Sequence, residues 1–145
     1  MLLTALCFMW AGMVLGISFL GTPVKFTAPS VTLPIGLDVG RHVFAMFNKV
    51  EVGWAIVICG LMIYSRVGRA VWLPLSEVVG IVALQTWWLL PLLDARVTMI
   101  LAGQTPPRAA HHIIYVVLEL LKMIGLLAAG TACLWALKRL TPITP

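Results

Sequence analysis

Residues 108–139 read RAAHHIIYVVLELLKMIGLLAAGTACLWALKR, an apolar run that only a few polar side chains interrupt. The run is longer than the about 20 apolar residues with which a helix crosses the hydrocarbon core of a bilayer. Trp135, Lys138 and Arg139 at its end are the aromatic and basic residues typical of a membrane–water interface. The stretch therefore predicts a membrane-spanning helix over 109–137.

The composition of the whole chain agrees with this stretch. Of the 145 residues, 61% are hydrophobic and only 10% are charged, against about 45–50% apolar and 25% charged in soluble domains. A soluble globular protein is excluded, and the length accommodates four spans with little chain left for an extramembrane domain. We expect an all-α integral membrane four-helix bundle that forms a single domain over 1–145. The expected spans cover 2–20, 42–65, 73–96 and 109–137.

Prolines and glycines predict local departures from four uniform helices at three places. Segment 22–37 contains Pro23, Pro29 and Pro34, and because proline removes a backbone donor we expect a non-helical, Pro-rich interfacial segment between helices 1 and 2. Pro91 predicts a kink in the third span, with helix continuing as far as Leu101. In the first span, Gly12 and Gly16 have the GxxxG spacing that lets another helix approach closely, so we expect them to pack helices together.

The charge distribution bears on partners and orientation. The formal net charge is +5, but the basic residues are spread singly, which excludes a nucleic-acid partner. The lipid bilayer is the expected surrounding, with other membrane subunits or further copies of the chain as partners. Four basic residues fall on the side of the termini and four on the other side, and the first four lie in short segments next to span ends, so we expect both termini in the cytoplasm. These are Arg66, Arg69, Lys138 and Arg139 on the one side, and Lys25, Arg41, Arg96 and Arg108 on the other.

Polar residues in the fourth span follow one another at intervals of four, three, four and three. At about 100° per residue this spacing keeps them within an arc of roughly 80° and forms a polar stripe on an apolar helix. Ionisable residues inside a membrane cost roughly 2.5–3.5 kcal/mol each on insertion scales, so they normally face the bundle interior. The stripe consists of Arg108, His112, Tyr115, Glu119 and Lys122.

The second span presents a matching face with Arg41, Asn48 and Glu51. Both helices begin on the same side of the membrane, and at about 1.5 Å per residue the carboxyls of Glu51 and Glu119 lie at similar depth. We expect the two faces to meet in a buried polar network or ion path, with charged residues at its rim. The expected network comprises Asn48, Glu51, Gln85, His112, Tyr115, Glu119 and Lys122, and the expected rim comprises Arg41, Asp94, Arg96 and Arg108.

Two functions are compatible with such a stripe. As a buried network, with Lys122 paired to Glu119 or Glu51, it holds the helices together, which is typical of a noncatalytic accessory or structural subunit of a larger membrane complex. As a path lined by Glu, His and Lys side chains, it indicates transport of protons, ions or small solutes. The first is the principal hypothesis and the second is its alternative.

A cofactor is a further alternative. His42 or His112 could supply a ligand to haem or to a metal ion, although adjacent His111 and His112 point about 100° apart and cannot both face one ion. No cofactor is predicted on the residues alone. The serines lack a nucleophile motif and the chain has no glycine-rich phosphate loop, so we expect no catalytic residues and no enzyme activity.

Three stretches carry a resemblance: 22–26 (TPVKF), 38–44 (DVGRHVF) with Asn48 and Glu51, and 93–96 (LDAR) leading to 103–107 (GQTPP) and His112. Together they resemble small uncharacterised bacterial four-span inner-membrane proteins of a domain-of-unknown-function family. The resemblance covers most of the chain. It implies a four-span architecture and a location in the bacterial inner membrane, and it carries no assigned chemistry.

Overall fold

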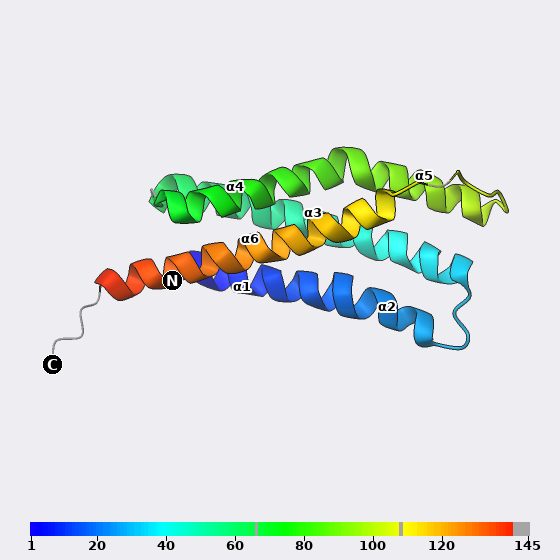
Figure 1. The fold of residues 1–145 in the computed structure, drawn as a ribbon, viewed down its shortest axis with the longest axis horizontal. Helices are drawn as coiled ribbons and strands as arrows, with labels where there is room; N and C mark the ends of the chain where they lie inside the picture. The colour runs from blue at the N-terminus through cyan, green and yellow to red at the C-terminus, as the bar shows by residue number, and fades with distance from the viewer. Residues whose placement is uncertain (66, 108, 141–145) are drawn as a thin grey trace.

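The computed structural model describes residues 1–65, 67–107 and 109–140, and within these residues it is helical and contains no strand. Four long helices run side by side (Figure 1). The first, Leu2–Thr27, consists of α1 (Leu2–Val14), the π-helical turn η1 (Leu15–Gly21), α2 (Thr22–Val24) and the 3₁₀ turn η2 (Lys25–Thr27). The second is α3 (Leu33–Ser65). The third, Arg69–Leu101, consists of α4 (Arg69–Leu84), the π turn η3 (Gln85–Leu89) and α5 (Leu90–Leu101), and the fourth is α6 (His111–Leu140).

All four helices are long and apolar enough to cross a membrane, so the chain is a multi-pass membrane protein with the expected four-helix architecture. The longest two have 33 residues each, which corresponds to about 50 Å and exceeds the roughly 30 Å of the hydrocarbon core. They therefore tilt or protrude. The N-terminus and the end of α6 lie at the same end of the bundle (Figure 1).

The closely packed core lies toward the termini, where α6 runs against both α1 and α4. Its side chains are fully buried, among them Cys7, Ile58 and Leu126. Two glycines on α6 allow this close approach: a Cβ on Gly125 would lie 3.0 Å from Val78, and a Cβ on Gly130 would lie 3.0 Å from Phe8. The tightest helix contacts thus depend on α6.

The Pro-rich segment expected over 22–37 is helical for most of its length, which corrects that expectation. The first helix continues to Thr27, α3 begins at Leu33, and only 28–32 separates them. Pro23 and Pro34 each stand in the first turn of a helical segment. Proline is tolerated there because the first amide groups of a helix have no intrahelical acceptor.

A π turn precedes two of the prolines that lie inside the spans, whereas Pro74 stands inside α4 without one. Pro23 follows η1 and Pro91 follows η3. A proline ring clashes with the carbonyl four residues earlier, and a widened turn is one way in which a helix accommodates such a clash. Figure 1 shows the third helix bending between α4 and α5, where a kink at Pro91 was expected.

The helices extend beyond the expected spans, since α3 begins nine residues before 42 and the third helix covers Arg69–Leu101 rather than 73–96. Gly12 and Gly16 do not have the expected packing role within the chain. A Cβ on either would meet no described atom within 4 Å, because the face of the first helix that carries them points away from the other spans. The close contacts are made by Gly125 and Gly130 instead.

Candidate functional site

Three ionisable side chains meet in the middle of the bundle. Lys122 on α6 places its Nζ 2.5 Å from Glu51 Oε1 on α3 and 2.6 Å from Glu119 Oε1 on its own helix. Each of the three side chains is at most 1% exposed. A single ammonium thus bridges two carboxylates in an environment without water contact, and the geometry forms two short charge-assisted hydrogen bonds. We call Glu51, Glu119 and Lys122 the charge cluster.

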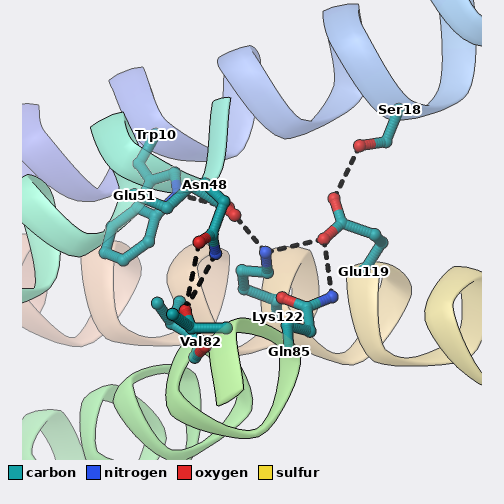
Figure 2. A network of polar contacts seen from close by, with 9 residues as sticks. Trp10, Ser18, Asn48, Glu51, Val82, Gln85, Glu119 and Lys122 are labelled. Carbon is teal, nitrogen blue, oxygen red and sulfur yellow. Dashed lines mark hydrogen bonds and ion pairs between the residues drawn. The ribbon is translucent and has the colours of Figure 1, made fainter. Parts of the chain in front are cut away.

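Every span contributes either a residue of the charge cluster or a side chain that hydrogen-bonds to it (Figure 2). From the first helix, Trp10 donates its indole N–H to Glu51 Oε1 at 3.0 Å, and the Ser18 hydroxyl donates to Glu119 Oε2 at 2.6 Å. From the third helix, the Gln85 amide donates to Glu119 Oε1 at 2.9 Å. The cluster therefore joins all four helices at one level of the membrane.

Two of these contacts come from the π turns, one in the first helix and one in the third. Ser18 lies in η1, and Gln85 and Thr86 lie in η3. A π turn rotates the side chains on either side of it relative to an α-helix, and such turns are frequent at functional sites. Here the widened turns that accompany Pro23 and Pro91 present polar side chains to α3 and α6.

Asn48 and Tyr115 lie beside the charge cluster rather than on it. Asn48 exchanges hydrogen bonds with Thr86, its Nδ2 donating at 3.0 Å to the threonine oxygen, while the Thr86 hydroxyl also lies 2.7 Å from the Val82 carbonyl. The Tyr115 ring is buried and packs edge-on against Phe44, with ring centroids 5.1 Å apart. The structure thus brings together six of the seven expected network residues, and the seventh, His112, is exposed nearer the rim.

An open cavity of about 950 Å³ extends from the charge cluster to the end of the bundle that carries 28–32 and 102–107. Its floor contains Glu119 and the polar side chains around it, and its walls are mostly apolar. The floor residues are Ser18, Asn48, Thr86, Tyr115 and Glu119, and the apolar wall includes Phe19, Leu37, Phe44, Leu90, Leu93 and Val97.

Charged side chains surround the outer part of the cavity. Arg41 pairs with Asp38 at 2.8 Å and lies 3.7 Å from Asp94, while the Arg96 guanidinium donates to the carbonyl of Pro107. Arg41, Asp94 and Arg96 therefore stand at the expected rim, and the fourth expected rim residue, Arg108, lies outside the described residues.

Two lysines in the cavity wall were not singled out from the sequence as site residues. Lys25 at the end of the first helix reaches across to α3, where its ammonium lies over Gly40 and 5.0 Å from the Phe26 ring centroid. Lys49 is the middle residue of α3 and is exposed. In the part of the chain that the structure describes, neither lysine forms an ion pair with a carboxylate.

The bundle is closed on the other side of the charge cluster. Val14, one turn from Ser18 toward the N-terminus, is 0% exposed, as are Ile58 on α3 and Leu126 on α6. These side chains belong to one apolar cluster that fills the space between the spans. The cavity thus extends from Glu119 toward one end of the bundle, whereas packed apolar side chains fill the bundle on the other side of the charge cluster.

The histidines are poorly placed for a shared ligand. His42 is exposed and its Nδ1 lies 2.8 Å from the Asp38 carbonyl oxygen, and His112 stands on a different helix at the cavity wall. Among the described residues, no three His, Cys, Asp or Glu side chains are close enough together to hold a metal ion.

Trp10, Ser18 and Thr86 are contacts of the network that sequence reasoning missed. The signal for two of them is a spacing: Ser18 and Thr86 each precede a mid-span proline by five residues, which is the reach of a π turn.

Comparison with protein-family models, with curated proteins and with solved structures found no match.

Proposed function

We propose that this multi-pass protein is a proton-linked membrane transporter of a small solute. The observation that carries the proposal is the open cavity whose floor is one carboxyl of a buried cluster with two carboxyls and one ammonium. The solute enters from the end of the bundle that carries 28–32 and 102–107. The proton is shared by the carboxyl pair Glu51 and Glu119, so that loss of either carboxyl removes the need for it.

The charge balance of the cluster supports proton binding. With all three groups ionised, the cluster carries a net charge of −1 on side chains that are each at most 1% exposed. An uncompensated buried charge is costly, and one proton on a carboxyl neutralises the cluster. The side chains that face the two carboxyls from the other helices are Trp10, Ser18 and Gln85, and Tyr115 is the nearest other titratable group on α6.

Gln85 is suited to either protonation state of Glu119. Its Nε2 donates to the carboxylate, while its buried Oε1 has no hydrogen-bond partner among the described residues. An amide carries both donors and an acceptor, so rotation of the amide by half a turn presents the free oxygen to a protonated carboxyl. The Gln85 side chain can therefore face Glu119 with a donor or with an acceptor.

One-sided access supports a carrier rather than an open channel. The cavity reaches Glu119 from one end only, while packed apolar residues separate Glu51 from the other end. Transport then requires a second arrangement in which that packed half opens. The helix segments beside the cavity, η1 and α5, have no buried residues.

Infrared difference spectroscopy of the purified protein tests the proton-binding step. As the buffer pH is changed, we expect the C=O stretch of a protonated carboxyl to appear in the native protein and to be lost in Glu119→Gln. Glu77→Gln is the matched control, because Glu77 is exposed on α4 and outside the cluster. A pH-dependent carboxyl band that is the same in Glu119→Gln and in the native protein would contradict the proposal.

Proteoliposomes that contain a trapped pH dye test the transport step. After a pH gradient is imposed, we expect native protein and Glu77→Gln to move protons faster than protein-free liposomes do. Glu119→Gln, although folded and inserted to the same extent, should fall to the protein-free rate. Equal proton movement by the native protein and Glu119→Gln would contradict the proposed transport function.

An accessory-subunit role is the second candidate, and the open glycine face of the first helix favours it. Gly12 and Gly16 are exposed and would accept a second helix at close range. The polar stripe, in contrast, makes its contacts inside the chain. Native mass spectrometry in a mild detergent tests this candidate. We expect a stoichiometric partner or a second copy that is lost in Gly12→Leu, and a monomer in the native protein would refute it.

A further inference from the structure

The cavity differs from an ordinary gap between helices in its size and in its walls. Its volume of about 950 Å³ is at the upper end of the about 300–1,000 Å³ typical of small-molecule sites. Figure 1 shows that α6 begins short of the outer ends of α3 and α5, and only its first residues, from His112 to Glu119, line the cavity.

The walls combine apolar surface with an excess of positive charge. Among the described residues, four basic side chains from three different elements line the cavity, against two acidic ones. Glu119 is occupied by the charge cluster at the floor, and Asp94 stands next to Arg41 at the rim. The basic side chains are Lys25, Arg41, Lys49 and Arg96.

The two lysines are the part of this charge that remains available. Arg41 has Asp38 and Asp94 as neighbours and Arg96 has the Pro107 carbonyl, but within the described ranges no carboxylate pairs with Lys25 or Lys49. Lys49 is the middle residue of a 33-residue span, and an unpaired ammonium at that depth is costly in a membrane. An anion inside the cavity would remove this cost.

We propose that the cavity binds a single-chain amphiphile with an anionic head group, such as a long-chain carboxylate or an alkyl phosphate. Lys25 and Lys49 supply the positive charge that attracts the head group, and the alkyl chain lies against Phe19, Phe44 and Leu93 in the apolar wall. This inference rests on the proposed function in one respect, since it takes the cavity as the solute site. A singly charged anion bound together with one proton on the charge cluster would cross the membrane without net charge.

Fluorescence binding in nanodiscs made only of zwitterionic phosphatidylcholine tests the inference, with the fluorescent fatty acid cis-parinarate as the probe. We expect saturable binding that hexadecanoate or hexadecyl phosphate displaces, and the stronger of the two identifies the head group. Hexadecan-1-ol should displace the probe at least about tenfold less well, because it lacks the charge. Equal displacement by the alcohol, or displacement by acetate or inorganic phosphate alone, would overturn the inference.

Substitution of the lysines locates the site. We expect Lys25→Met and Lys49→Met each to weaken probe binding by about tenfold or more, and Lys25→Arg to restore most of it. Lys138→Met is the matched control, because this exposed lysine lies at the far end of α6 and should bind the probe as the native protein does. Native affinity in both cavity variants would overturn the inference.

The two proposals fail separately. Probe binding is measured at constant pH and without a gradient, so an unchanged carboxyl band in Glu119→Gln would remove proton linkage and leave anion binding in place. Conversely, native probe affinity in Lys25→Met and Lys49→Met, together with proton movement that depends on Glu119, would leave a transporter whose solute is not an amphipathic anion.

Discussion

The half of the bundle nearer the termini and the half nearer 28–32 and 102–107 consist of the same four helices but are packed differently. In the first half, α1 has seven buried residues and the glycines of α6 allow close helix contact. In the second half, η1 and α5 have none, and an open cavity occupies the space between the helices. The charge cluster lies at the boundary. We infer that the packed half provides stability and the open half provides access.

The largest effect is expected at the boundary itself, in Lys122→Met. This change keeps the length of the side chain but leaves Glu51 and Glu119 without their shared cation. Removal of one partner from a buried ion pair costs about 3–5 kcal/mol, so we expect a loss of that order in the free energy of unfolding, measured by denaturant titration in detergent. Lys138→Met should leave the free energy unchanged, and an equal loss in both variants would show that the charge cluster is not what stabilises the boundary.

The next effect contrasts one leucine from each half. Leu126 on α6 is fully buried in the packed half, whereas Leu93 on α5 lines the cavity. Leu126→Ala should lower the free energy of unfolding by about 2–3 kcal/mol because it leaves a void in a packed region. Leu93→Ala should cost less than about 1 kcal/mol. Equal costs in the same denaturant titration would contradict the difference between the halves.

A smaller effect on stability, with a larger one on geometry, is expected for Pro91→Ala. Without the proline ring, η3 can return to an α-helix, which turns Thr86 away from Asn48. We expect a change of less than about 1 kcal/mol in unfolding and a clear shift of the Asn48 side-chain amide signals by NMR. Pro34→Ala at the start of α3 should leave these signals in place. Unshifted signals in Pro91→Ala would show that the π turn does not depend on Pro91.

The smallest effect is expected at the rim. Asp94 is 61% exposed and lies 3.7 Å from Arg41, which also has Asp38. Exposed ion pairs contribute little, so Asp94→Asn should change the free energy of unfolding by at most about 0.5 kcal/mol. The difference should vanish at high salt. A larger, salt-independent loss would place Asp94 in the structural framework rather than at an open rim.

The four spans and the polar stripe could be predicted from the sequence because they depend on apolar length and on spacing along one helix. The three- and four-residue intervals that end in Glu119 and Lys122 are local properties of α6. The contacts of Trp10, Ser18 and Thr86 could not be predicted in this way, because they depend on how separate helices are rotated against one another.

The π turns and the proline-containing helix ends show the same limit of prediction from sequence. The average preference of proline against helix argued for a non-helical segment over 22–37, but Pro34 stands in the first turn of α3, where no hydrogen bond is lost, and Pro23 follows the π turn η1. Likewise the GxxxG spacing of Gly12 and Gly16 is real, but only the arrangement of the four helices decides that their face points away from the other spans.

Water accessibility at two positions on one face of the first helix tests most directly the claim that an open half meets a closed half at the charge cluster. In a background with Cys7, Cys59 and Cys133 replaced by alanine, Ser18→Cys and Val14→Cys would be exposed in membrane vesicles to a membrane-impermeant thiol reagent. Ser18 is in the cavity floor and Val14 is fully buried one turn away. We expect the reagent to label Ser18→Cys and not Val14→Cys, and labelling of both or of neither would contradict the account.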